Sequence, residues 1–192
     1  MTDTHDPSQF RQVSALRDGR PVLIRAARAD DRERLVTAFQ GLDRQTIYTR
    51  YFSFRKGFSE TEFKRLEQAD FSRYMLLVAT LGSGTEETII AGASCVVTDA
   101  AGPAPTAEIA FMVEEDYQRQ GLASQMLTTI AGLARRRGIV RLEADVLAQN
   151  PAMLAVFKRC GWPMTTSHSG GVVHLVLDLS AQAPATSAES KA

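Results

Sequence analysis

The chain alternates between short apolar runs and longer amphipathic segments over most of its length. The short runs are rich in Val, Ile, Leu and Thr, a composition that favours β-strands over helices. They are bounded by Gly, Pro, Asp and Asn, which are typical of turns. We therefore predict strands at residues 21–27, 74–80, 88–98, 106–113, 139–147 and 171–179.

The longer segments place apolar residues three and four positions apart, the spacing of one helix face. We predict helices at residues 30–41, at 44–51, from Ser59 onward, at 121–137 and at 150–161. Asp30 or Asp31 would cap the first helix. Ser59 and Glu62 form a capping-box pattern at the start of the third. The resulting order, β-α-α-α-β-β-β-α-β-α-β, predicts a mixed α/β or α+β domain.

The length of 192 residues suits one domain with a substantial core. Residues 1–12 and the tail 181–192 are small and polar, so we predict that both are disordered. No linker long enough to separate two domains lies between them. A single domain spanning residues 13–180 is the expected organisation.

Composition excludes several classes of function. Lysine plus arginine and aspartate plus glutamate each total 22, so no bulk charge indicates a nucleic acid or an anionic membrane as partner. No apolar run approaches the ~20 residues that a membrane span needs, and the N-terminus lacks the apolar core of a signal peptide. The two cysteines, Cys95 and Cys160, lack metal-ligand spacing, so we expect no metal, a reducing compartment and a cytoplasmic location.

One polar turn indicates a binding site. The strand at 106–113 is followed by Gln118-Arg119-Gln120-Gly121-Leu122-Ala123 and then by a helix. A helix N-terminus carries free backbone N–H groups and a partial positive charge, and Gly121 lets a ligand approach the backbone closely. The turn therefore predicts an anion site, or else Gly121 is simply a helix cap. It lacks the Gly-Lys-Ser/Thr of nucleotide hydrolases and the three glycines of dinucleotide sites.

A second motif follows about thirty residues later, with Asn150, Met153, Val156-Phe157, Arg159 and Gly161-Trp162 at fixed spacing. In this order, the two motifs resemble those of the GCN5-related N-acetyltransferase (GNAT) superfamily, from about Val22 to Leu179. Within it, the phrase containing Leu42, Thr46, Tyr48, Arg50, Tyr51 and Phe52 resembles the catalytic domain of bacterial protein-lysine acetyltransferases.

This resemblance implies a mixed, mainly antiparallel sheet whose central strands splay apart, flanked by helices. Acetyl-CoA would be the co-substrate. Its pantetheine arm would lie in the opening and its diphosphate on the turn, where Arg119 would add a charged contact or else form an exposed salt bridge. Asn150 would bind the amide arm and Lys158 would lie near the adenosine phosphate. The residues implied at the cofactor are Phe111, Val113, Gln118, Arg119, Gln120, Gly121, Leu122, Ala123, Asn150, Met153, Phe157 and Lys158.

Acetyl transfer to an amine needs a base, because a lysine amine is almost fully protonated at neutral pH. Glu108 is the first candidate, since its apolar sequence neighbours predict a half-buried carboxyl and superfamily members often carry a glutamate base here. Alternatively, it is an exposed residue at the first turn of the strand. Glu143, on the neighbouring splayed strand, is the second candidate; its alternative is an outward-facing polar position.

One departure from the family pattern concerns the leaving group. Many relatives have a tyrosine, able to protonate the CoA thiolate, where this chain has Phe157. Phenylalanine has no proton to give, so the thiolate leaves as an anion or another group supplies the proton.

Three functions remain open at this point. The favoured one is direct attack by a protein lysine on acetyl-CoA within a ternary complex. The alternatives are acetylation of a small amine, such as a polyamine, an amino acid or an aminoglycoside, and a non-catalytic module that senses acyl-CoA. The aromatic residues Tyr48, Tyr51, Phe52 and Phe54 are either a wall of the acceptor pocket or helix core.

Overall fold

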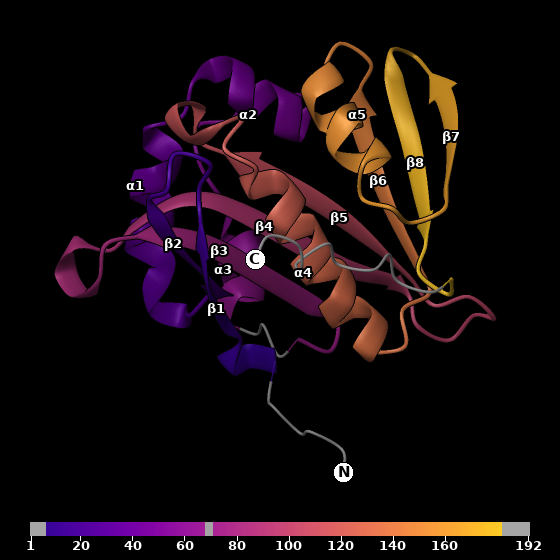
Figure 1. Cartoon of the computed structure of the whole chain (residues 1–192), viewed down its shortest axis with the longest axis horizontal. Helices are drawn as coiled ribbons and strands as arrows, with labels where there is room; N and C mark the ends of the chain where they lie inside the picture. Colours follow the sequence, from indigo (N-terminus) through magenta and orange to yellow (C-terminus); the bar gives the residue numbers. More distant parts are fainter. Residues whose placement is uncertain (1–6, 68–70, 182–192) are drawn as a thin grey trace, which may run out of the picture.

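A computed structural model of the chain describes residues 7–67 and 71–181. An eight-stranded sheet runs through the molecule in the order β1-β2-β3-β4-β5-β6-β8-β7 (Figure 1). All neighbouring strands are antiparallel except β5 and β6, which are parallel. The expected mixed, mainly antiparallel sheet is therefore confirmed.

The strands of this sheet are β1 Arg11–Ala15, β2 Pro21–Ala26, β3 Tyr74–Leu81, β4 Thr88–Asp99, β5 Thr106–Val113, β6 Arg141–Leu147, β7 Met164–Ser169 and β8 Val172–Asp178. The helices are α1 Arg32–Gln40, α2 Arg44–Tyr51, α3 Glu60–Glu67, α4 Leu122–Arg136 and α5 Pro151–Lys158. Short 3-10 turns lie at Pro7–Gln9, Ala29–Asp31, Gly84–Glu86 and Glu115–Tyr117.

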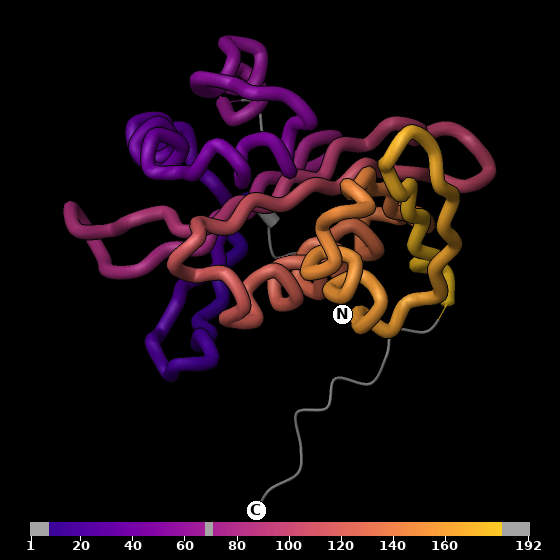
Figure 2. The backbone as a smooth tube through the Cα atoms, turned by 90° about the horizontal axis from the view of Figure 1, so that it is seen from above, coloured from indigo at the N-terminus to yellow at the C-terminus, as the bar shows by residue number. Residues whose placement is uncertain are grey.

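Helices cover both faces of the sheet, with α1, α2 and α3 on one side and α4 and α5 on the other (Figure 2). The larger core lies beneath α4, whose Met126 and Ile130 are fully buried. A smaller core joins α1 and α3 to the sheet through Leu35, Phe63 and Val78. Successive residues of a strand point to opposite faces of the sheet, so they pack against different helices. The α4 side and the α1–α3 side of the sheet therefore have separate sets of side chains.

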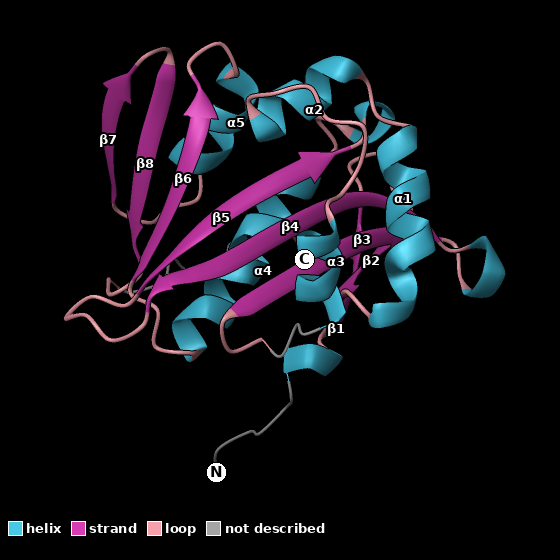
Figure 3. Cartoon of the chain, turned by 180° about the vertical axis from the view of Figure 1, so that it is seen from behind, coloured by secondary structure: helices cyan, strands magenta, loops and turns pink. Residues whose placement is uncertain are grey.

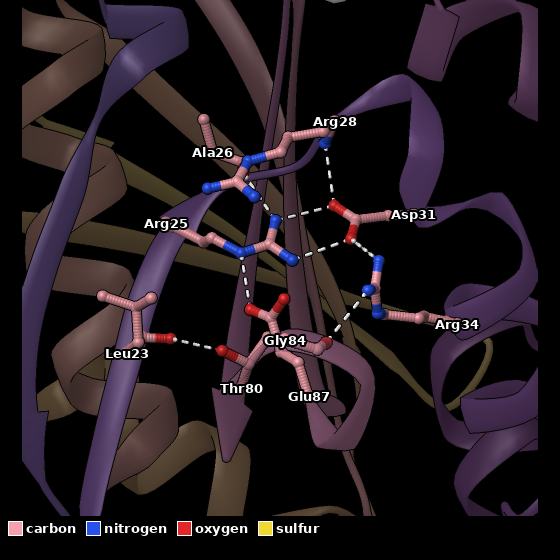
Figure 4. Close-up of polar contacts among 9 residues, drawn as sticks. All are labelled: Leu23, Arg25, Ala26, Arg28, Asp31, Arg34, Thr80, Gly84 and Glu87. Atoms are coloured by element: carbon pink, nitrogen blue, oxygen red, sulfur yellow. Dashed lines mark hydrogen bonds and ion pairs between the residues drawn. The ribbon is translucent and has the colours of Figure 1, made fainter. Parts of the chain in front are cut away.

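A buried ion-pair network fixes the start of α1 (Figure 4). Arg25 of β2 donates from both terminal nitrogens to the carboxylate of Asp31, at 2.7 Å each, and from Nε to Glu87 at 2.9 Å. Asp31 also accepts from the backbone N–H of Arg28. Asp31 is the N-cap residue of α1, as one of the two expected candidates, but its carboxylate accepts from Arg25 and Arg28 and makes no cap bond to the helix.

Two edge strands were not predicted. β1 and β7 consist mostly of exposed positions, so neither shows the apolar alternation that reveals a half-buried strand. The prediction of disorder over residues 1–12 is corrected for residues 7–12, because a 3-10 turn at Pro7–Gln9 and the start of β1 lie there. Residues 1–6 and 182–192, where disorder was also expected, lie outside the described residues.

Candidate active site

The two central strands separate soon after they begin. β5 and β6 pair only at Thr106–Arg141, Ala107–Leu142 and Glu108–Glu143, and beyond these pairs they diverge (Figure 3). The rest of β5 keeps β4 as its partner, and the rest of β6 keeps β8. The splayed strands expected from the resemblance are present.

A cleft of about 540 Å³ opens where the strands diverge. We call it the interstrand cleft; it is lined mainly by residues 109–124 and 144–159, with α2 and Arg17 at its rim. Cavities of this size are typical of small-molecule sites. All of the cofactor residues implied by the resemblance line it except Gln120 and Lys158.

The turn at the start of α4 is shaped to receive an anion. Gly121 is the N-cap residue with φ +84°, and Arg119 has φ +61°, so the backbone twice enters the left-handed region. Successive N–H groups in such a turn converge, and the first N–H groups of α4 have no partner within the helix. The side chain of Gln118 donates to Val113 O at 3.1 Å, which ties the turn to the end of β5.

The second motif forms the opposite wall. Asn150 caps α5 by accepting from Met153 N at 3.1 Å, so its carboxamide has its NH₂ group to offer a ligand. Phe157 is 2% exposed and meets Phe111 edge to face, with ring centroids 6.1 Å apart. The wall at Phe157 is therefore apolar and provides no hydroxyl.

Two cofactor residues expected from the resemblance lie off the cleft. Gln120 turns toward the β1–β2 loop, where its carbonyl and side-chain oxygens accept from Arg17 N and Asp18 N. Lys158 is exposed at the end of α5. Its sequence neighbour Arg159 lines the cleft instead.

Positive charge dominates the interstrand cleft. Its lining includes Arg17, Arg50, Arg119 and Arg159, against a single carboxylate, Asp145. That carboxylate is itself paired with His174 at 2.8 Å. Of these arginines, only Arg119 was expected at the cofactor from the sequence. Arg50 and Arg159 lie within the quoted motifs but were given no role there, and Arg17 lies outside them. A cleft with this charge favours a ligand that carries phosphates.

Glu108 lies on the face of β5 opposite α4 and is exposed. The half-burial expected from its sequence neighbours is absent, because Ala107 and Ile109 face the α4 core while Glu108 faces away from it. Glu143, half-buried on β6, is its cross-strand neighbour. The two candidate bases are thus side by side at the point where the strands part, and neither lines the interstrand cleft.

A second cavity of about 80 Å³ lies between α1–α3 and the sheet. We call it the helical pocket; its walls include Tyr51, Phe58, Phe63, Tyr74, Met112 and Glu114. It shares Arg50, Ala110 and Met112 with the interstrand cleft, so the two cavities meet at these residues. Of the aromatic cluster considered above, only Tyr51 lines this pocket; Phe52 and Phe54 are exposed.

Two carboxylates of the helical pocket have opposite character. Burial raises the pKa of Glu114, and the nearby Asp116 and Glu115 raise it further. For Glu62, burial is outweighed by hydrogen bonds from Arg55 and Ser59, which lower its pKa to about 2. Glu62 and Ser59 also exchange the two bonds of the predicted capping box. No sequence motif marks Glu114, because its burial depends on helices that are distant in sequence.

Two further properties concern metals and membranes. Among residues 7–67 and 71–181, no group of three or more His, Cys, Asp or Glu side chains is placed to hold a metal ion. No helix within the same ranges is long and apolar enough to cross a membrane.

The sequence of this chain is similar to those of known acetyltransferases. Residues 44–162 match the family model described as "Acetyltransferase (GNAT) family". The chain is 32% identical over 147 residues to Acetyltransferase PA5475 of Pseudomonas aeruginosa, covering 73% of this chain and 74% of that protein. It is 30% identical over 146 residues to Acetyltransferase Pat of Mycolicibacterium smegmatis, covering 76% of this chain but only 42% of that protein.

Solved structures agree with these matches. The GNAT domain of S. lividans PAT superposes with a TM-score of 0.78 at 35% identity, covering 88% of this chain and 96% of that one. An acetyltransferase from Salmonella typhimurium, yncA, solved with its cofactor acetyl-CoA, shares the fold at a TM-score of 0.65 and 17% identity, with 86% of this chain and 98% of that chain covered. The chain therefore belongs to the GNAT family and is an acetyl-CoA-dependent N-acetyltransferase.

Proposed function

We propose that the acceptor is the side-chain amine of a protein lysine, acetylated by direct attack within a ternary complex. The observation that carries this proposal is the meeting of two cavities at β5. The interstrand cleft follows the open edge of the strand, and the helical pocket lies against its α1–α3 face. Cofactor and acceptor can therefore reach Ala110 and Met112 together, without a covalent enzyme intermediate.

The lining of the helical pocket suits an alkyl ammonium group. Tyr51, Phe58 and Tyr74 offer aromatic surface for an aliphatic stem and a cation. Glu114 offers a half-buried carboxylate. A volume of about 80 Å³ admits a single side chain rather than a bulky amine. The matched relatives named Pat and the resemblance of residues 42–52 to protein-lysine acetyltransferases support the same acceptor.

In the proposed reaction, the lysine nitrogen bonds to the acetyl carbon and the carbon–sulfur bond breaks. Glu108 accepts the amine proton, directly or through a water, because it shares a face of β5 with Ala110 and Met112, which line the helical pocket. Glu143, beside Glu108 on the adjacent strand, is the second candidate for this proton-accepting role. The CoA sulfur leaves as the thiolate, since Phe157 donates no proton. Cofactor binding is assigned to the turn at 118–123, to Phe111 and Val113, and to Asn150, Met153 and Phe157.

The test is CoA thiol release across a panel of folded bacterial proteins, polyamines, amino acids and aminoglycosides, followed by mass spectrometry of the product. We expect acetyl-lysine on a protein, with turnover lowered about 100-fold in Glu108→Gln and kept in Glu33→Gln, an exposed α1 control. If turnover occurs only with small amines, the acceptor is a small amine and not a protein lysine. CoA binding without turnover on any acceptor would favour the sensor alternative.

We also infer a cytoplasmic location from the cysteines. Cys95 is buried and Cys160 half-buried, and both are free thiols. This is the usual state of cysteines in a reducing compartment.

A further inference from the structure

The N-terminal hairpin reaches the anion-binding turn. β1 and β2 form the edge of the sheet, and the loop between them extends on the α4 side (Figure 2). The loop is closed by Leu16 N donating to Arg20 O, and Gly19 adopts φ +88°. Arg17, at the tip, is one of the residues that line the interstrand cleft.

Hydrogen bonds hold this hairpin on the turn. Arg17 N donates to Gln120 O at 3.2 Å, and Arg17 Nη1 donates to Arg119 O at 3.2 Å. Gln125 of α4 adds two more links, accepting from Ser14 Oγ at 2.7 Å and donating to Ala15 O at 2.9 Å. These hydrogen bonds join residues more than 100 positions apart in sequence, and they fix the position of Arg17 relative to the turn.

The guanidinium of Arg17 lies above the glycine of the turn. A Cβ added at Gly121 would be 3.8 Å from Arg17 Nε, so the guanidinium lies beside the N-cap residue of α4, and both residues line the interstrand cleft. The guanidinium donates to the backbone carbonyl of Arg119 rather than to a carboxylate. Among the described residues, no ion pair involves Arg17, whereas its neighbours Asp18 and Arg20 neutralise each other at 2.7 Å.

We propose that Arg17 forms a charged contact with the diphosphate of acetyl-CoA. The diphosphate would then lie between the N–H groups of the turn and the guanidinium groups of Arg17 and Arg119. Arginine suits this role because its planar group donates in pairs to phosphate oxygens. Arg17 acts here as a binding residue, and the N-terminal hairpin becomes part of the cofactor site. The inference depends on acetyl-CoA as co-substrate and not on the identity of the acceptor.

The test is calorimetric titration of Arg17→Gln with CoA and dephospho-CoA, with pantetheine measured by competition. Arg11→Gln is the control, since Arg11 is an exposed arginine on the same hairpin and does not line the cleft. We expect Arg17→Gln to weaken CoA and dephospho-CoA about tenfold, which equals about 1.4 kcal/mol, and to leave pantetheine unchanged. Arg11→Gln should match the wild type with all three.

Three outcomes would overturn the proposal. An unchanged affinity for CoA would remove Arg17 from the site. An equal loss with pantetheine would show that the hairpin acts through the shape of the cleft. A loss with CoA that disappears with dephospho-CoA would assign Arg17 to the 3′-phosphate. Thermal unfolding of each variant shows whether the fold is intact. The titrations need no acceptor, so a negative result for Arg17 would not bear on the proposal that the acceptor is a protein lysine.

Discussion

The interstrand cleft and the helical pocket meet at three residues but are built in different ways. The cleft takes most of its lining from two continuous stretches, 109–124 and 144–159, and offers backbone N–H groups at the turn. The helical pocket collects side chains from α1, α2, α3 and three strands. A site made of local backbone suits a ligand that is constant across a family. A site made of dispersed side chains can change its acceptor by substitution without disturbing the cofactor.

The largest effect should come from the network that supports the helical side. Arg25 and Asp31 are 1% and 0% exposed, so Asp31→Asn leaves a buried guanidinium without its main partner. We expect a loss of about 3–5 kcal/mol in the free energy of unfolding, measured by urea denaturation. CoA affinity of the folded variant should be unchanged, because the network does not line the cleft.

The matched control is Glu60→Gln, which breaks an exposed pair with Arg32 and should cost less than ~1 kcal/mol. Equal effects of the two substitutions would show that burial of the Arg25 network contributes nothing. A large loss of CoA affinity in Asp31→Asn would show that the two regions are not separable.

The same network makes stability depend on pH. Burial opposes ionisation of Asp31, but hydrogen bonds from Arg25 and Arg28 outweigh it, so its pKa is lowered; Arg25 likewise lowers that of Glu87. This stabilisation is full above the unfolded pKa values, about 4, and is lost as pH falls through the lower folded values. Urea midpoints between pH 7 and pH 3 should fall less steeply in Asp31→Asn than in the wild type.

The next effect concerns the chemical step. Glu108→Gln should lower kcat about 100-fold while the Kd of CoA stays the same, because the carboxylate lies outside the cleft. Glu143→Gln should lower kcat less than about tenfold. Initial rates at saturating acetyl-CoA give the comparison, and a larger loss in Glu143→Gln would exchange the two roles.

The cleft can be disturbed through its turn. Gly121→Ala places a Cβ at φ +84° beside Arg17, and we expect the Kd of CoA to rise about tenfold as the turn distorts. Gly138→Ala is the control, because Gly138 has φ +80° with open space around it at the far end of α4. Both variants should lose similar stability, and only the first should lose affinity. An equal loss of CoA affinity in Gly138→Ala would mean that backbone strain alone explains the weaker binding.

The smallest effect separates the two cavities directly. Glu114→Gln removes a carboxylate from the helical pocket, and we expect the KM of the amine acceptor to rise about fivefold as a half-buried charge contact is lost. The KM of acetyl-CoA should stay constant. If acetyl-CoA is affected instead, the pocket is part of the cofactor site.

Sequence predicted the central elements because their signals are local. The apolar stripe of α4, the capping box of Ser59 and Glu62, and Gly138, which follows α4 with φ +80°, each lie within a few residues. β1 and β7 escaped prediction because an exposed edge strand is held mainly by backbone pairing to one neighbour. Val13 of β1, for example, is 74% exposed.

The site divides in the same way. The turn at 118–123 and the start of α5 were predicted because short motifs place backbone and side chains together. Arg17 and Arg50 could not be, since their contacts with Arg119 and Ser94 join segments 102 and 44 positions apart. The burial of Glu108 was misjudged because neighbours in a strand point to opposite faces.

The divergence of β5 and β6 gives the sheet two interior edges, where backbone donors and acceptors face a gap instead of another strand. Such edges invite pairing with foreign chains, and here α2, α4 and α5 border the gap. An elongated ligand with amide groups can fill this gap and take the place of a β-strand between β5 and β6. Ligand at 100 times its Kd adds about 2.7 kcal/mol to the stability of the fold. The cellular supply of acetyl-CoA would then govern how long the enzyme survives as well as how fast it works.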